Sequence, residues 1–582
     1  MDAGKKTITD VISRARILEI PFFQRPYVWG EEQWERLVED LEELSVLNKP
    51  HFLGSIILKQ LETAASEEIG DRRLLVDGQQ RLTTLLILFK VTSLMKDGGA
   101  LFKSVCTTYQ GGIPIIHNHL NQPSFNRVLE LESLEKLDSA GDRIIEAYEW
   151  FRKKVDHEKL NLNRILSHVQ FVGIDLSVDE DEQLIFDTIN SLGIKLTSAE
   201  LLKNYLYRRE DLADYRTEWK EVFERDEDLV NYWDTTATTG RVKKTFVDLF
   251  LHSLLQILAE RAGIQGEERA YYFKSDRVFQ KYKDLVEGEH YSRADLRREV
   301  ADYGRVFSEH FSSTVMDRGL NDNPSDRLVA LMMGCDASTL APYVLYLLKH
   351  QSDVEERQKV CEILESFICR RLMCRITSSS YSKLFYVQLI GANACTAELL
   401  TENLLKREGT DLAFPSNASL RTAIYESKLL NRNARGLLYM MESKTRHRDQ
   451  ATQLHGMGTY TLEHIMPKKW KEKWPQLDSE LDEVKRNEKL RKIGNLCILP
   501  SKLNTRLSNS SWGQKRDGDS KNPGLRKLAQ GLELMADWVE KEEWDESVID
   551  SRAKFLYSKM IEAWPALSSE SRSDVNDDLF VG

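Results

Sequence analysis

Four residues near the end of the chain have the types and spacing that metal-assisted hydrolysis of a phosphodiester requires. Glu463 and His464 are adjacent in "TLEHIMP", Asn495 follows in "IGNLCIL", and Asn504 comes nine residues later. Mg²⁺ or Mn²⁺ prefers oxygen ligands and polarises a phosphate, so we predict Glu463 and Asn504 as metal ligands. A neutral histidine can take a proton from water near pH 7, so we predict His464 as the general base.

The position of these residues on a strand limits how they can act together. Neighbouring residues of a regular strand point to opposite faces, so Glu463 and His464 can share one ion only at a strand end or a bend. Pro467 favours such a bend. We expect Asn495 to bond to the backbone near the histidine and to hold a hairpin in place, and we count it with the catalytic residues. This pattern is typical of HNH, or ββα-metal, nucleases.

Basic residues gather around this motif. Residues 465–527 hold 16 Lys and Arg against 8 Asp and Glu, whereas the whole chain carries a net charge of −11. We predict DNA contacts from Lys468, Lys469, Asn509 and Lys515, with Asn509 and Lys515 also able to support the metal site. The alternative is a solvated basic face. For "PKKWKEKW", tryptophans packed on the core with lysines in solvent fit the sequence equally well.

A second group of polar residues interrupts "LLVDGQQRLTTLLILF" (residues 74–89), where an apolar strand gives way to apolar residues at helical spacing. The amino end of a helix exposes unpaired N–H groups and stabilises an anion. Gly78 permits close approach, Gln79 and Gln80 can donate hydrogen bonds, and Arg81 can bind two phosphate oxygens. Asp77 suits a metal ion, a water or a ribose hydroxyl. The stretch fits a phosphate cradle, or a tight turn with surface amides.

Two further blocks accompany it. "IPFFQRPYVWGEEQW" contains Gln24 and Arg25, and "FDTINSLGIKLTSAELLKN" contains Asn190; "HFLGSIIL" (51–58) is a strand in which Gly54 allows a close backbone approach. These blocks closely resemble the N-terminal domain of GmrSD-type, modification-dependent (type IV) restriction systems, over most of residues 8–210. The same domain occurs in BrxU-like and SspE-like defence proteins.

The resemblance implies a ParB/sulfiredoxin-like fold that binds and hydrolyses nucleoside triphosphates. The nucleotide contacts that it implies are Gln24, Arg25, Asp77, Gly78, Gln79, Gln80, Arg81 and Asn190. "GNLCILPSKLNTRLSNSSWGQK" is similar to the C-terminal nuclease domain of the same systems, and that similarity extends over about residues 455–520.

The elements that position these motifs predict an α+β protein of several domains, because 582 residues exceed one hydrophobic core. Residues 1–210 mix strands, such as 170–177, with helices, such as 32–44 and one that begins with a Thr197–Glu200 capping box. Residues 211–405 are helical almost throughout and form a connector without chemistry of its own. Residues 406–582 form the nuclease domain, with a final helix at 525–544.

The composition indicates the cellular compartment in which the protein works. No run of eighteen apolar residues occurs, so we expect no membrane span, and the first residues lack the apolar core of a signal peptide. Seven scattered cysteines fit free thiols in a reducing cytoplasm. A homodimer through the helical middle stays open, since no sustained heptad repeat supports it.

These observations predict a single-chain DNA endonuclease that depends on, or is regulated by, a nucleoside triphosphate. It would use Mg²⁺ or Mn²⁺ to cleave or nick modified phage DNA. The main alternative is a binding protein that senses a nucleotide or modified DNA and carries an inactive HNH-like domain. A nuclease that acts on RNA is a third option, because the hairpin chemistry does not itself read the 2′-hydroxyl.

Overall fold

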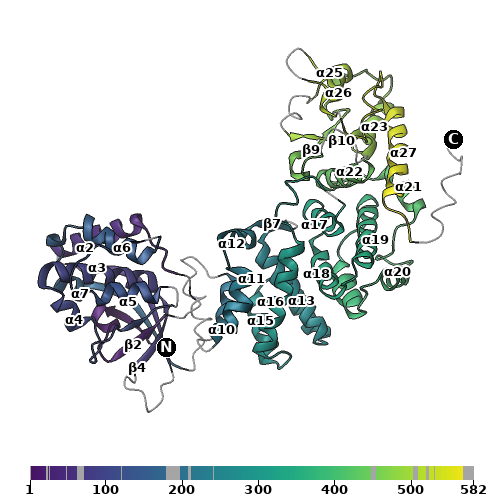
Figure 1. Cartoon of the computed structure of the whole chain (residues 1–582). Coiled ribbons are helices and arrows are strands. Elements are labelled where there is room, and N and C mark those ends of the chain that lie inside the picture. Colours follow the sequence, from purple (N-terminus) through teal and green to yellow (C-terminus); the bar gives the residue numbers. More distant parts are fainter. Residues whose placement is uncertain are drawn as a thin grey trace. The chain divides into compact units, whose positions relative to one another are not determined.

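The computed structural model of the chain describes residues 2–20, 24, 26–47, 49–61, 71–118, 121–139, 141–178, 197–207, 211–239, 242–320, 322–446, 454–501, 509–519, 523–529 and 531–567. The chain folds as two compact units, residues 1–216 and 217–582 (Figure 1). The first boundary lies close to the one expected near residue 210. The second unit contains both the helical segment and the C-terminal region, and the expected division near residue 405 stays a prediction.

A mixed sheet forms the centre of the first unit. Its strand order is β1-β6-β3-β4-β2-β5. The β6–β3, β4–β2 and β2–β5 pairs are parallel, and the other two pairs are antiparallel. The strands are β1 (Asp2–Thr7), β2 (Arg16–Glu19), β3 (His51–Gln60), β4 (Asp71–Asp77), β5 (Ile115–Ile116) and β6 (Val169–Leu176). The strands expected at 51–58 and 170–177 are thus confirmed as β3 and β6.

Helices pack around this sheet (Figure 1). They are α1 (Ile8–Val11), α2 (Glu31–Leu47), α3 (Gln79–Asp97), α4 (Ala100–Val105), α5 (Gln122–Glu130), α6 (Arg143–Lys154), η1 (His157–Lys159) and α7 (Leu162–His168). Two helices, α9 (Ser198–Leu206) and α10 (Leu212–Asp214), follow later in the chain. Helix α2 buries an apolar stripe that includes Trp34, Leu37 and Leu41, as its periodicity predicted. Helix α9 begins with the predicted capping box between Thr197 and Glu200. Because α3 is buried on nearly every side, its position in the core is closely constrained.

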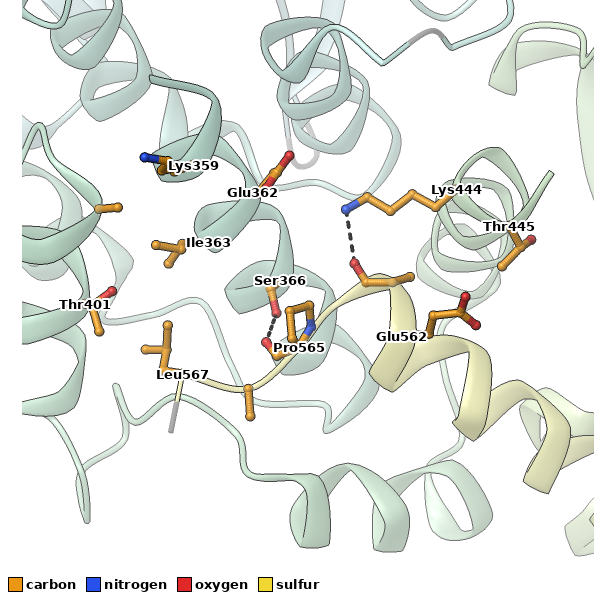
Figure 2. A pocket seen from close by; sticks show the side chains of 13 residues that line it. Lys359, Glu362, Ile363, Ser366, Thr401, Lys444, Thr445, Glu562, Pro565 and Leu567 are labelled. Atoms are coloured by element: carbon orange, nitrogen blue, oxygen red, sulfur yellow. Dashed lines mark hydrogen bonds between the residues drawn. The ribbon is translucent and has the colours of Figure 1, made fainter. Parts of the chain in front are cut away.

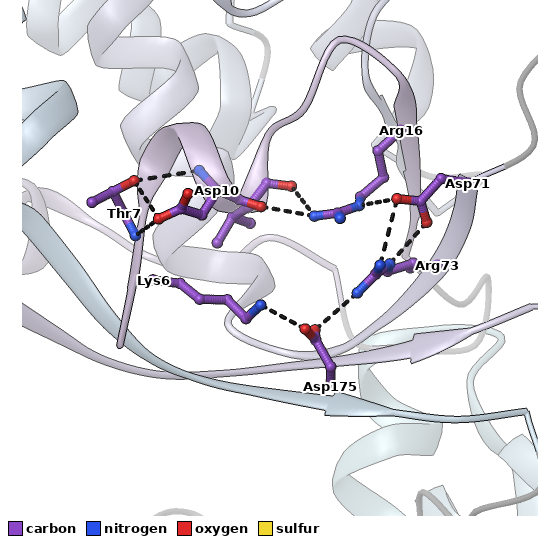
Figure 3. A network of polar contacts seen from close by, with 8 residues as sticks. Lys6, Thr7, Asp10, Arg16, Asp71, Arg73 and Asp175 are labelled. Atoms are coloured by element: carbon purple, nitrogen blue, oxygen red, sulfur yellow. Dashed lines mark hydrogen bonds and ion pairs between the residues drawn. The ribbon is translucent and has the colours of Figure 1, made fainter. Parts of the chain in front are cut away.

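An ionic network ties four strands together (Figure 3). Asp175 of β6 accepts from Lys6 of β1 at 2.5 Å and pairs with Arg73 of β4 at 3.0 Å. Asp71 of β4 accepts from Arg73 and from Arg16 of β2, each at 2.8 Å. The network fixes the beginning of β4, so the far end of that strand is held in a defined place.

The second unit starts with a helical segment. Its elements are η4 (Tyr215–Lys220), α11 (Glu221–Phe223), α12 (Glu227–Asp234), β7 (Thr236–Thr239), β8 (Val242–Thr245), α13 (Phe246–Arg261), α14 (Gly266–Phe273), α15 (Val278–Glu287), α16 (Arg293–His310), α17 (Pro324–Gly334), η5 (Ser338–Leu340), α18 (Ala341–His350), α19 (Val354–Met373), η6 (Lys383–Leu389) and α20 (Ala397–Leu405). The predicted helical character of this segment is confirmed, with one short hairpin, β7–β8, inside it.

The C-terminal part of this unit surrounds a two-stranded hairpin. Its elements are α21 (Asn417–Glu426), α22 (Asn431–Thr445), η7 (Met457–Thr459), β9 (Tyr460–His464), η8 (Trp470–Glu472), α23 (Glu480–Lys489), η9 (Ile493–Asn495), β10 (Leu496–Pro500), α25 (Trp512–Asp517), α26 (Leu525–Leu528) and α27 (Glu546–Ala563). Strands β9 and β10 pair antiparallel, with Glu463 opposite Cys497 and His464 opposite Leu496.

Buried polar contacts join α27 to the helical segment and explain why both belong to one unit. Arg327 of α17 donates two hydrogen bonds to Glu365 of α19, at 2.8 and 2.7 Å, and Glu365 also accepts from the Trp564 indole at 2.9 Å. A cavity of about 710 Å³ lies beside this junction (Figure 2). At its wall Ser366 donates to the carbonyl of Pro565 at 2.8 Å. The chain that follows α27 is therefore anchored against α19.

The final helix predicted at 525–544 is wrong. Among the described residues of this stretch, only α26 is helical; residues 533–540 form turns, and the last described helix is α27. The Glu442 carboxylate accepts from the backbone N–H groups of Glu533 and Leu534 at 2.8 and 3.0 Å. Gly531 adopts a left-handed φ of 84°. A tertiary contact therefore takes the donors that a helix would use, and the local pattern is overridden.

None of the helices in the described ranges combines the length and the apolar composition that crossing a lipid bilayer requires.

Candidate functional site

The strand-to-helix junction at Asp77–Arg81 forms as predicted. Strand β4 ends at Asp77, and α3 begins at Gln79. Gly78 joins them with a left-handed φ of 98°, which favours glycine, and a Cβ there would lie 3.1 Å from Ile56. Helix α3 has no side-chain cap at this end, so its first N–H groups are suited to receive an anion.

The Arg81 guanidinium is held inside the protein at this junction. Its Nη1 donates to the Leu53 carbonyl at 2.9 Å, and its Nη2 pairs with Asp77 Oδ2 at 3.1 Å. Ser55 Oγ donates to the same carboxylate oxygen at 2.7 Å. The close approach expected at Gly54 is confirmed, since a Cβ there would lie 2.0 Å from Arg81 Nη1. In this arrangement Arg81 joins β3 to β4 instead of presenting both nitrogens to a phosphate.

Two of the predicted nucleotide-binding amides hold a neighbouring loop. Gln80 Nε2 donates to the Pro26 carbonyl at 3.1 Å, and its Oε1 accepts from the Val28 N–H at 3.0 Å. Gln24 Nε2 donates to the Val76 carbonyl at 3.0 Å. These bonds fix the loop against the end of β4. The structure thus brings Gln24 and residues 77–81 together, and it gives Gln80 and Arg81 structural contacts that the sequence did not reveal.

Gln79 is buried at the start of α3. Arg25 and Asn190, the other two predicted nucleotide contacts, lie outside the described residues.

His464 is the last residue of β9 and faces a cavity of about 530 Å³ in the second unit. Burial, together with the positive charges of three nearby side chains, lowers the pKa of its imidazole to about 4; burial has the largest effect, followed by Lys468, Lys515 and Arg491. The ring is therefore neutral at pH 7, as a general base must be. The cavity is lined by Arg375, Lys428, Leu429, Leu430, Asn431, His464, Lys468, Arg491 and Leu496.

Asn495 makes the predicted backbone contacts near the histidine. Its side chain is 0% exposed. Oδ1 accepts from the Met466 N–H at 2.8 Å and from the Trp544 indole at 3.1 Å. Nδ2 donates to the carbonyls of Met466 and Leu490, at 2.9 and 3.0 Å. Asn495 therefore fixes the backbone two residues beyond His464, with all of its hydrogen-bonding capacity used inside the protein.

Glu463 lies among different neighbours. Its carboxylate forms an ion pair with Lys515 of α25, whose ammonium also donates to the His464 carbonyl at 2.8 Å. Burial raises the pKa of the Glu463 carboxyl and lowers that of the Lys515 ammonium, while the two charges oppose these shifts. Lys515 is 0% exposed and cannot reach a DNA phosphate in this arrangement, so the predicted DNA contact there is corrected to a contact with Glu463.

The described residues do not fit a divalent cation at Glu463. Its carboxylate is held by a buried ammonium, and cations rather than carboxylates line the cavity at His464. Within the described ranges no cluster of three or more His, Cys, Asp or Glu side chains could hold a metal ion. Asn504, the second predicted ligand, lies outside those ranges.

The remaining predicted DNA contacts lie nearer the surface. Lys468 and Lys469 are exposed, and Lys468 lines the cavity; Asn509 is partly exposed. The two tryptophans of "PKKWKEKW" are buried, and their indoles donate to Asn487 Oδ1 and to the Ser510 carbonyl, each at 3.0 Å. The tryptophans of that stretch therefore pack in the core, and the contact of its exposed lysines with DNA stays a prediction.

Arg375, Lys428 and Arg491 were not among the predicted site residues. Arg491 lies within the basic stretch 465–527, so local charge pointed toward it. Arg375 and Lys428 lie outside that stretch, and only the fold brings them to His464.

Comparison with known families places the chain in a class. A family model of the GmrSD restriction endonuclease N-terminal domain matches residues 8–207, and one of the C-terminal domain matches residues 414–559. No curated protein matches the chain. Together the two matches cover more than half of the chain and define a restriction endonuclease that acts on DNA.

More particularly, the chain belongs to the GmrSD-type, type IV restriction endonucleases, which act in defence against modified DNA. Residues 208–413 lie between the two matches.

Proposed function

We propose that this chain hydrolyses phosphodiester bonds of modified phage DNA, by nicking or double-strand cleavage, at an HNH-type site in which His464 is the general base. The observation that carries the proposal is the imidazole of His464 at the wall of a cavity that four cationic side chains also line. Cations of that cavity attract the DNA backbone, and the imidazole takes the proton from the attacking water. Asn495 keeps the backbone beyond the histidine in position.

We further propose that Mg²⁺ or Mn²⁺ and a nucleoside triphosphate are cofactors of this reaction. For the nucleotide, the support is the uncapped amino end of α3 beside Gly78, in a unit proposed to have the ParB/sulfiredoxin-like fold. For the metal, the support is the chemistry of phosphodiester hydrolysis, and the Glu463–Lys515 pair does not fit an ion at that carboxylate.

The test is digestion of matched hydroxymethylated, glucosylated, phosphorothioated and unmodified phage DNAs by the full chain. Each DNA is incubated with Mg²⁺ and each nucleoside triphosphate, then with EDTA or without nucleotide. Cleavage of at least one modified DNA that stops with EDTA and changes with nucleotide is expected. Arg81→Ala should remove the effect of the nucleotide, because it releases the contacts to Leu53 and Asp77. Equal rates with and without nucleotide would contradict the coupling.

The Glu463–Lys515 ion pair favours one rival, a binding protein that senses a nucleotide or modified DNA through an inactive HNH-like domain. This rival predicts tight binding to modified DNA without cleavage under any metal and nucleotide condition. The same digestions, followed by a binding assay on each DNA, separate the two functions.

A further inference from the structure

The positive charges that line the cavity at His464 are not balanced by any carboxylate of its wall. Four cationic side chains line it, from Arg375, Lys428, Lys468 and Arg491, and none of the lining residues is a carboxylate. In the described part of the chain, none of these four side chains takes part in an ion pair. The contrast is pronounced in a chain where 92 acidic residues outnumber 81 basic ones.

The four cations come from separate segments of the fold. Arg375 follows α19, Lys428 lies between α21 and α22, Lys468 follows β9, and Arg491 follows α23. All four are exposed at the cavity, although they repel one another. Such an arrangement is stabilised by an anion, and a phosphodiester matches both the charge and the neighbouring imidazole.

We propose that Arg375 binds a DNA phosphate in the nuclease cavity, together with Lys428, Lys468 and Arg491. This inference rests on the proposed nuclease function and adds a part of the chain that neither family model matches. The helical segment is then more than a connector, because it supplies one of the cations that hold the substrate beside His464.

The backbone at Arg375 allows an unusually clean test. Its φ is 54°, a left-handed conformation that an arginine adopts at a cost and a glycine adopts freely. Arg375→Gly therefore removes the guanidinium without straining the fold. Arg277 is a matched control, since it is also exposed, has a φ of 49° and does not line the cavity. Arg277→Gly makes the same chemical change elsewhere in the helical segment.

Binding is measured on the full chain carrying His464→Ala, which prevents cleavage, with a fluorescent DNA duplex over a range of salt concentrations. Losing one phosphate contact should reduce the slope of log K against log salt by about 0.9, which weakens binding about 8-fold at 0.1 M salt. Arg375→Gly should show this change and Arg277→Gly should not. Arg375→Lys should restore most of the slope, because it keeps the charge.

Cleavage and competition assays separate the possible failures. With His464 intact, Arg375→Gly should raise KM more than it lowers kcat. If wild-type protein cleaves modified DNA and Arg375→Gly matches it in salt slope and KM, this inference is overturned while the proposed function stands. If wild-type protein cleaves no DNA, the proposed function fails first. If Arg375→Gly weakens inhibition by inorganic phosphate but leaves DNA affinity unchanged, the cavity takes free phosphate, which also overturns the inference.

Thermal melting checks whether Arg375→Gly keeps the stability of the wild-type protein. Arg375→Gly should melt at or slightly above the temperature of wild type, because glycine relieves the left-handed backbone. If it melts lower, Arg375→Gln, which keeps part of the side chain, replaces it in the same binding series. An unchanged salt slope in that variant would then count against the proposal.

Discussion

Replacing Asn495 by alanine tests whether the histidine is positioned by the contacts that the structure shows. The substitution removes the acceptor of the Met466 N–H and of the Trp544 indole N–H. It also removes the donor to two carbonyls, those of Met466 and Leu490. Since Asn495 is fully buried, water cannot replace these partners without opening the structure.

The expected loss of stability follows from the two orphaned donors. A buried donor left without a partner costs about 1–3 kcal/mol, so the two N–H groups together cost about 2–6 kcal/mol. At about 2 °C per kcal/mol for a large domain, the melting temperature should fall by at least about 4 °C. Cleavage should be lost even below the melting transition, because the backbone at Met466 is released two residues from His464.

Asn487→Ala is the matched control. Asn487 is exposed and accepts a single hydrogen bond, from the Trp470 indole at 3.0 Å, and water can replace this acceptor. Its stability should change by less than about 0.5 kcal/mol. Melting is followed by circular dichroism, and cleavage is measured on the same samples. An Asn495→Ala protein that melts and cleaves like the Asn487→Ala protein would refute the positioning role.

Two further predictions follow from the charges around the hairpin. Because the pKa of His464 is about 4, kcat/KM should begin to fall on the acid side only well below pH 6.5. Lys468→Ala removes a nearby cation and should therefore move this fall to higher pH, whereas Lys469→Ala should not. A fall centred at pH 6.5 in the wild-type protein would contradict this prediction. Lys515→Met leaves Glu463 buried and unpaired, which should cost about 3–5 kcal/mol. Burial raises the pKa of that carboxyl, so the loss should be larger at pH 8 than at pH 5 in thermal melts, and a pH-independent loss would count against the ion pair.

The sequence was sufficient for features that depend on neighbouring residues. The junction at Asp77–Gly78–Gln79 follows from an apolar strand, a glycine and a helical period in direct succession, and the structure contains each of them. The capping box at Thr197 and Glu200 is equally local. The contact of Asn495 with the Met466 backbone spans 29 positions, and the HNH-like motif rather than a local pattern predicted it.

Features that depend on distant segments were missed. Arg375 precedes His464 by 89 positions in the chain, and no local pattern relates the two. The sequence around Lys515 is typical of an exposed lysine, yet Lys515 is buried in an ion pair with the carboxylate of Glu463. The helix predicted over 525–544 is absent because Glu442, about ninety residues earlier, takes its backbone donors. For Lys515 and for residues 533–534, a long-range electrostatic contact outweighs local propensity, whereas Arg375 reaches the cavity through the fold of the helical segment alone.

The most direct measurement compares wild-type protein with His464→Ala on a modified phage DNA in the presence of Mg²⁺ and nucleotide. Removal of a general base should slow cleavage by about 10²- to 10⁴-fold. The melting temperature and the affinity for DNA should change little, since the imidazole lines a cavity and the cations around it remain. A His464→Ala protein that cleaves that DNA at the wild-type rate would show that His464 is not the general base.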